Sequence, residues 1–194
     1  MATKSSNLYK VCQSYFGITS SLTQRQKINF CQAIGTTESK LKSVFEQKSI
    51  APIDEYFALE KKQKLVVSFL NGFLNIAESK TKLFEKYLRF EDKISIPTPG
   101  HAYNKIVIKL TYVHNLSENR LALLTYGPST EITIELGILR CLYTKFSSPA
   151  NFDKYNEYEY WNLRSGTVQR IRKNQIKSIN IQNVLPAIYR LVDG

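Results

Sequence analysis

A basic segment near the end of the chain has the residue types that bind anions. Asn162–Gln182 holds five cationic side chains and no carboxylate. The five are Arg164, Arg170, Arg172, Lys173 and Lys177. They alternate with branched apolar residues, so a β-hairpin formed here can expose a basic face while it buries the opposite one. Because such cations neutralise phosphates, the segment predicts contact with a polyanion.

Aromatic residues directly precede this segment, within Tyr155–Trp161. Sheets that hold single-stranded nucleic acid combine positive charge with exposed rings on which the bases stack. The same alternation is typical of rings buried in a core, and Glu157 and Glu159 interrupt the basic character. Two interpretations therefore stay open: a platform for a single strand, or a half-buried hairpin with a solvated basic side.

A second pattern, Gln26–Gln47, resembles the generic helix-turn-helix of DNA-binding proteins and no particular family. That unit needs a small residue where its helices meet, a glycine at the turn, and two branched apolar residues that seat the second helix. Cys31, Gly35, Leu41 and Val44 have the required spacing. The resemblance implies DNA contacts by Thr37, Ser39, Lys40, Lys42 and Ser43, with Arg25 and Lys27 beside the unit. Any compact helical hairpin turned by a glycine has the same pattern, so that alternative stays open.

Catalytic motifs are absent from the sequence. It contains no P-loop, no GxGxxG and no GxSxG, and neither of its two histidines, His101 and His114, has a metal-binding spacing. The carboxylates from which a Mg²⁺-dependent nuclease could be built are Glu131, Glu135, Asp153 and Glu157. Their spacing does not favour a shared site. The sequence therefore predicts a non-enzymatic protein with no metal and no cofactor.

Two hydrophobic periodicities divide the chain. From Leu8 to about Phe90 the apolar residues recur at helical spacing, and the longest helical segment is 59–90. The segments that alternate as strands are Lys105–Val113, Leu121–Tyr126, Glu131–Leu136, Tyr158–Leu163, Thr167–Arg172 and Lys177–Ile181. A short helix is expected from Val184 to Val192.

The predicted fold class is therefore α+β, with a helical N-terminal half followed by a mainly antiparallel β-sheet C-terminal half. Two prolines and a glycine within Ile96–Gly100 cannot continue a helix. We therefore expect a helical domain over 1–92, a Pro/Gly linker over 93–100 and a β-rich domain over 101–194.

The composition limits the classes of partner and the compartment that the sequence favours. The chain has 194 residues, and its 27 basic and 16 acidic side chains give a net charge of +11, which attracts polyanions. Three widely spaced cysteines support neither a disulfide framework nor a zinc site, and they favour a reducing compartment. No signal peptide and no membrane-spanning run is recognised, so a cytoplasmic location is expected. The broad apolar stripe of 59–90 would form a homo-oligomer seam if the other helices leave it uncovered.

These observations favour a non-enzymatic nucleic-acid-binding protein, with DNA favoured over RNA. It would bind through a helix-turn-helix at about 24–48 and use its β-rich half for assembly or regulation. The alternative is a basic structural or adaptor subunit that docks acidic protein partners in a large complex. The two differ in where the charge lies, since a DNA reader concentrates it on one surface and an adaptor spreads it over the molecule.

Overall fold

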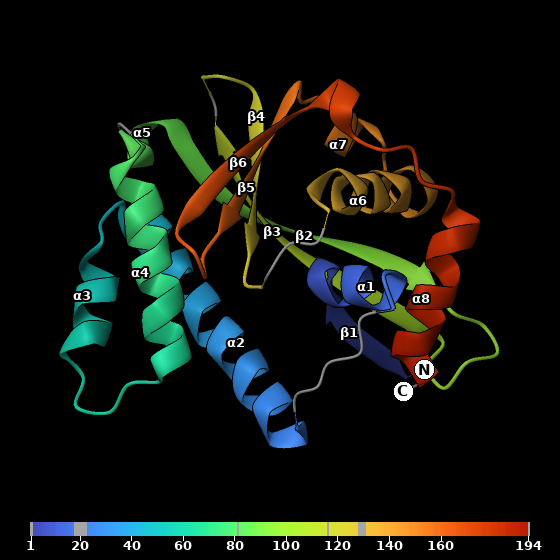
Figure 1. The fold of residues 1–194 in the computed structure, drawn as a ribbon, viewed down its shortest axis with the longest axis horizontal. Coiled ribbons are helices and arrows are strands. Elements are labelled where there is room, and N and C mark those ends of the chain that lie inside the picture. Colours follow the sequence, from blue (N-terminus) through green and yellow to red (C-terminus); the bar gives the residue numbers. More distant parts are fainter. Residues whose placement is uncertain (1, 18–22, 81, 116, 128–130, 194) are drawn as a thin grey trace.

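The computed structural model describes residues 2–17, 23–80, 82–115, 117–127 and 131–193 (Figure 1). The strands are β1 (Thr3–Asn7), β2 (Tyr87–Pro97), β3 (Lys105–Asn115), β4 (Arg120–Thr125), β5 (Glu157–Asn162) and β6 (Thr167–Arg172). The helices are α1 (Leu8–Tyr15), α2 (Gln24–Gln47), α3 (Ala51–Ala58), α4 (Lys64–Glu78), α5 (Leu83–Lys86), α6 (Ile132–Phe146), α7 (Ala150–Asp153) and α8 (Ile181–Asp193). A short 3₁₀ turn, η1 (Lys173–Gln175), follows β6.

All six described strands form one mixed sheet in which β3 is central. Along one edge of β3, β2 pairs antiparallel over its whole length. The other edge of β3 pairs first with β1, in parallel, and then with β4, antiparallel. Beyond β4 come β5, in parallel, and β6, antiparallel. The N-terminal half therefore supplies two strands, and the prediction of a mainly antiparallel sheet confined to the C-terminal half is wrong.

Helices cover both faces of this sheet (Figure 1). On one face α1, α6 and α8 pack against Leu121, Leu123 and their neighbours. On the other face α2, α3 and α4 pack around Ala122 and Trp161. The strands alternate between the two cores because successive side chains point to opposite faces of a sheet.

The predicted helix-turn-helix is one continuous helix. α2 runs through 24 residues with Gly35 in its interior, and no turn interrupts it. Thr23 caps the helix as its sequence position indicates. The helix continues beyond the glycine because Ala33, Thr37 and Leu41 extend one buried stripe at four-residue spacing. A mid-helix glycine costs about 1 kcal/mol relative to alanine, which such burial outweighs.

Three other segments differ from the predicted elements. Tyr87–Pro97, whose first residues were expected in a helix, forms β2, so the predicted 93–100 linker contains the end of a strand. The predicted strand Glu131–Leu136 lies mostly in α6, because the burial of Leu136, Leu139 and Tyr143 follows the helical period. The predicted strand Lys177–Ile181 leads into α8 without pairing in the sheet.

Ile94 and Ile96 of β2 are fully buried on the same sheet face as Ile106 and Ile108 of β3. The two sides of the expected linker thus share one core. Within the described residues, no helix is long and apolar enough to cross a membrane.

Candidate functional site

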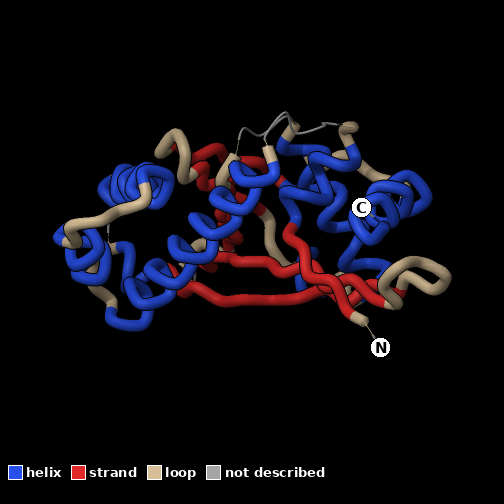
Figure 2. Tube along the Cα trace, turned by 90° about the horizontal axis from the view of Figure 1, so that it is seen from below, coloured by secondary structure: helices blue, strands red, loops and turns tan. Residues whose placement is uncertain are grey.

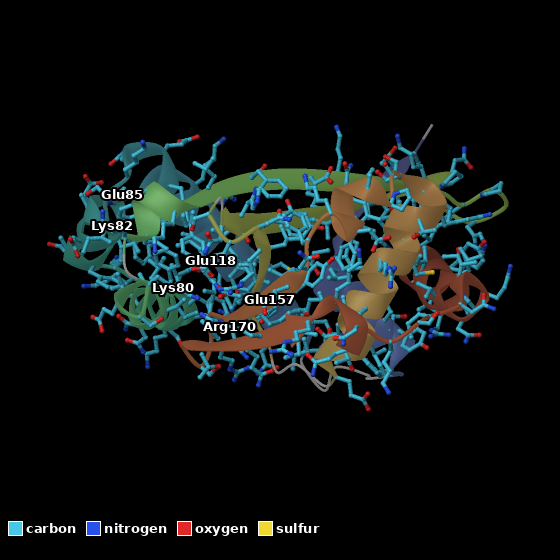
Figure 3. The ribbon with its side chains drawn as sticks, turned by 90° about the horizontal axis from the view of Figure 1, so that it is seen from above. Lys80, Lys82, Glu85, Glu118, Glu157 and Arg170 are labelled. Atoms are coloured by element: carbon cyan, nitrogen blue, oxygen red, sulfur yellow. The ribbon has the colours of Figure 1, made fainter. Side chains whose placement is uncertain are left out.

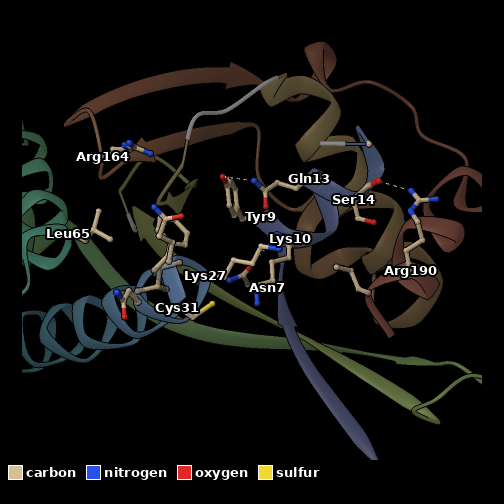
Figure 4. A pocket seen from close by; sticks show the side chains of 16 residues that line it. Asn7, Tyr9, Lys10, Gln13, Ser14, Lys27, Cys31, Leu65, Arg164 and Arg190 are labelled. Atoms are coloured by element: carbon tan, nitrogen blue, oxygen red, sulfur yellow. Dashed lines mark hydrogen bonds between the residues drawn. The ribbon is translucent and has the colours of Figure 1, made fainter. Parts of the chain in front are cut away.

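A cleft of about 1030 Å³ opens between α1 and α2, and we call it the α1–α2 cleft (Figure 4). Four elements distant in sequence contribute one cation each to its lining. These are Lys10 of α1, Lys27 of α2, Arg164 of the β5–β6 turn and Arg190 of α8. None of the described lining residues is acidic. The lining therefore concentrates positive charge in a concave surface, which strengthens the attraction for anions.

The cleft also presents rings and amides. Tyr9 of α1 and Phe30 of α2 line it with ring centroids 6.2 Å apart. Tyr9 accepts a 2.8 Å hydrogen bond from Gln13 Nε2, and burial raises its pKa although the nearby Arg164 charge opposes this. Side-chain amides in the lining come from Asn7, Gln13, Gln26 and Asn29. Amides can donate to phosphate oxygens or base edges, and rings can stack on bases.

Caps and helix contacts fix α1 in place. The Asn7 side chain caps α1 by accepting from the Lys10 backbone N–H at 3.0 Å. At the other end of α1, Ser14 Oγ donates to the Ala187 carbonyl at 2.9 Å, and Arg190 donates to the Ser14 carbonyl at 2.6 Å. These two contacts join α1 to α8 and bring Arg190 to the cleft.

Arg164 is positioned by a tightly packed turn. The Asn162 side chain accepts from the backbone N–H groups of Arg164 and Ser165 at 3.0 and 3.2 Å. Gly72 of α4 lies so close that a Cβ there would overlap the Leu163 carbonyl oxygen. The helix can therefore support this turn only because residue 72 has no side chain.

The four cleft cations have no ion-pair partner among the described residues. The negative charge of Glu135 contributes to the raised pKa of Tyr9, but Glu135 is buried, does not line the cleft and accepts a hydrogen bond from Tyr160. The cations of the cleft are therefore not neutralised by described carboxylates, and an anionic ligand can pair with them.

Only Lys27 and Arg164 of the predicted contact residues come together in the cleft. Thr37 is fully buried, and its hydroxyl donates to the Ala33 carbonyl at 2.8 Å. Lys42 approaches Glu46 at 3.9 Å on the same helix. The other predicted contacts on α2, which do not line the cleft, are Arg25, Ser39, Lys40 and Ser43. Burial therefore removes Thr37 from the predicted DNA contacts, whereas those of the other α2 residues stay predictions.

Two of the five cations of the basic hairpin form ion pairs within the molecule. Arg170 Nε lies 3.2 Å from Glu159, and Lys173 Nζ lies 3.6 Å from Asp153. Arg172 and Lys177 are exposed outside the cleft. The rings of Tyr155, Tyr158, Tyr160 and Trp161 are all buried. Of the two interpretations of this segment, the half-buried hairpin is the one that matches the structure.

A second charged region surrounds Glu159, whose side chain is completely buried. Four residues of this region, Lys80, Glu118, Glu157 and Arg170, are labelled in Figure 3. Glu159 accepts hydrogen bonds from Lys80 and from Trp161 Nε1, both at 2.7 Å. Burial would raise its pKa, but these hydrogen bonds outweigh burial and lower it. Arg120 binds Glu159 at 3.0 Å and also Glu118 and Glu157. We call this group the Glu159 network.

The four carboxylates considered for a Mg²⁺ site are not gathered. Glu135 binds Tyr160, Asp153 binds Arg140 at 2.9 Å, and Glu157 binds Arg120 at 2.8 Å. Across the part of the chain that the structure describes, no group of three or more His, Cys, Asp and Glu side chains could hold a metal ion.

Sequence reasoning missed Lys10 and Arg190. Each is the only cation of its helix, and neither lies in a local basic pattern. The signal is weak: one cation on an otherwise uncharged or nearly uncharged amphipathic helix.

Comparison with known protein families, curated proteins and solved structures finds no match to this chain.

Proposed function

We propose that this protein binds single-stranded nucleic acid in the α1–α2 cleft and performs no catalysis there. The observation that carries the proposal is the convergence of four cations, without a carboxylate among the described lining residues, on a cleft that also presents two rings. Phosphates would bind Lys10, Lys27, Arg164 and Arg190, and bases would contact Tyr9 and Phe30. Arginine suits this role because its planar fork matches two phosphate oxygens.

The size of the cleft supports a single strand over a duplex. Its volume of about 1030 Å³ is at the upper end of small-ligand sites, so it can hold a few unpaired nucleotides. Base stacking on rings contributes about 1–3 kcal/mol per base and tolerates any sequence. We therefore expect affinity with little sequence preference. The sequence favours DNA over RNA, and the binding experiment below distinguishes between them.

Fluorescence anisotropy with a dye-labelled oligothymidine of about six nucleotides tests the proposal. With four cations engaged, the log–log slope of affinity against salt should be about −3, so affinity falls about fiftyfold between about 50 and about 200 mM salt. Lys27→Ala combined with Arg164→Ala should weaken binding at least about tenfold and reduce the slope by about 1.5.

The matched control is Lys40→Ala with Lys42→Ala, which removes the same charge from α2 outside the cleft. Its affinity should stay within about twofold of the parent. An equal loss in both double variants would show that only net charge matters, and the cleft proposal would be abandoned. Oligouridine of equal length distinguishes RNA from DNA. Tighter binding to polyglutamate than to either strand would favour the adaptor function instead.

Cys31 gives a test that needs no substitution. It is exposed and lines the cleft, whereas burial raises the pKa of both the Cys12 and Cys141 thiols. A thiol reagent should therefore modify Cys31 first, because the thiolate is the reactive form. A bound oligonucleotide should slow that reaction. Unchanged reactivity under saturating oligonucleotide would place the binding site elsewhere.

A further inference from the structure

At one end of the sheet, one face is covered by none of the helices that the structure describes. In Figure 2 the long strands β2 and β3 run along the lower side of the molecule, with helices above them and beside their left ends. Ile94, Ile96, Ile106 and Ile108 are buried on the covered side. The residues that alternate with them point the other way. We call this uncovered surface of β1, β2 and β3 the open face.

The open face carries three exposed lysines, Lys93 of β2 and Lys105 and Lys109 of β3. Lys93 and Lys109 are directly opposite each other in the β2–β3 register. Like charges in such a position destabilise a sheet, so the arrangement has a cost unless an anion neutralises it. None of the three lysines has an ion-pair partner among the residues that the structure describes.

Other side chains of this face are small and polar or already neutralised. Ser5 and Ser95 flank Val107 in the register. The one carboxylate of β2 on this face, Glu91, binds Arg89 at 2.9 Å. The face is therefore basic and carries no ring among its described residues. Such a surface suits a phosphate backbone, since bases need rings to stack on.

Strand register connects the open face to the α1–α2 cleft. Asn7 of β1, which lines the cleft, is paired with Lys109 of β3, and Lys109 is paired with Lys93 of β2. Paired residues point to the same face, and neighbouring strands lie about 4.8 Å apart. The row Asn7, Lys109, Lys93 thus begins at the cleft and crosses the sheet over about 10 Å.

We propose that a single strand leaving the cleft continues across the open face, where Lys93, Lys105 and Lys109 bind its phosphates. This inference rests on the proposed function and specifies its substrate: a strand longer than the cleft can hold. Binding on the open face is to the backbone alone, so it is independent of base identity and strongly salt-dependent.

The test compares two strand lengths on the intact protein, oligothymidines of about five and about sixteen nucleotides. Lys93→Gln, Lys105→Gln and Lys109→Gln are combined in one triple variant. For the long strand its affinity should fall on the order of tenfold at low salt, and its salt slope should decrease by about 2. For the short strand its affinity should change less than about twofold, because the cleft is intact.

Lys40→Gln, Lys42→Gln and Lys61→Gln form the matched control, which removes equal charge elsewhere. It should bind both strands as the parent does. The melting temperature of the open-face variant should not fall, since the substitution removes a repulsion between paired strands. Loss of binding can therefore not be ascribed to unfolding.

Each outcome decides between the two proposals. An open-face variant that binds the long strand as the parent does overturns this inference and leaves the cleft proposal intact. Equal losses for the open-face and control variants also overturn it. If Lys27→Ala with Arg164→Ala binds both strands normally, the cleft proposal fails and this inference fails with it. A loss confined to the long strand supports it.

Discussion

The Glu159 network and the α1–α2 cleft are both rich in cations, yet they differ in what neutralises them. In the network Lys80, Arg120 and Arg170 all contact one buried carboxylate. In the cleft, four cations line the same cavity and no described lining residue is acidic. A count of positive residues along the sequence rates the two regions alike. Only the positions of the carboxylates separate a region that stabilises the fold from one able to accept a ligand.

The largest expected effect breaks the network. Glu159→Gln removes the carboxylate with which buried Lys80 pairs, while Arg120 keeps Glu118 and Glu157, so it should destabilise the fold by about 3–5 kcal/mol through the uncompensated lysine. Urea unfolding measures this difference. Glu157→Gln, at a more exposed carboxylate, should cost less than about 1 kcal/mol.

Removing cations from the cleft should, in contrast, have little effect on stability. Lys27→Ala with Arg164→Ala should change the free energy of unfolding by less than about 0.5 kcal/mol, because these exposed side chains have no partner to lose. If this double variant were as destabilised as Glu159→Gln, the cleft cations would stabilise the fold as the Glu159 network does, and the two regions would not differ in role.

A smaller effect tests whether α2 is one helix that holds Lys27 at the cleft. A Cβ added at Gly35 would meet nothing within 4 Å, so Gly35→Ala should raise the free energy of unfolding by about 0.5–1 kcal/mol. Thermal or urea unfolding measures the change. At a turn glycine with positive φ the same substitution would destabilise the protein instead. A lower free energy of unfolding in Gly35→Ala would therefore support a turn at Gly35, as in the predicted helix-turn-helix.

The smallest effect concerns pH. Burial, and secondarily the Lys154 charge, lower the pKa of His114 from its ordinary value of 6.5. Protonation therefore favours the unfolded chain: the His114 contribution is fully present above about pH 6.5 and is lost as pH falls below it. We expect the stability difference between about pH 7.5 and about pH 5 to be smaller in His114→Gln than in the parent. Equal differences would show that His114 adds nothing to the acid sensitivity.

Local features were predictable where the chain specifies them locally. β6 begins and ends at the predicted Thr167 and Arg172, because Ser165-Gly166 marks the hairpin turn that precedes it. The helical pattern from Leu8 and the cap at Thr23 are likewise present in α1 and α2. The predicted elements that proved wrong are those in which a short apolar pattern is compatible with both a strand and a helix. Ile132 and Ile134 alternate as in a strand, and only the apolar residues that follow them decide for a helix.

The candidate site could not be predicted as a unit. Lys27 and Arg164 were identified separately, each in a different proposed motif, and nothing local indicates that they share a cavity. Their association depends on α2 packing against α4 and on α4 packing against β5 and β6. Lys10 and Arg190 depend on other long-range contacts, the pairing of β1 with β3 and the packing of α1 on α8, so no spacing rule could identify them.

The packing of α1 on α8 has a consequence for the order in which the protein forms. Ser14 bonds to Ala187 and Arg190 across more than 170 residues of sequence. On a ribosome the first helix is therefore made long before its partner, while chains are synthesised at about 5–20 residues per second. The α2–α4 helices can associate early through local contacts, but the cleft cannot be complete until α8 has emerged. Ligand binding in the cleft thus becomes available only after α8 has been made and has packed on α1.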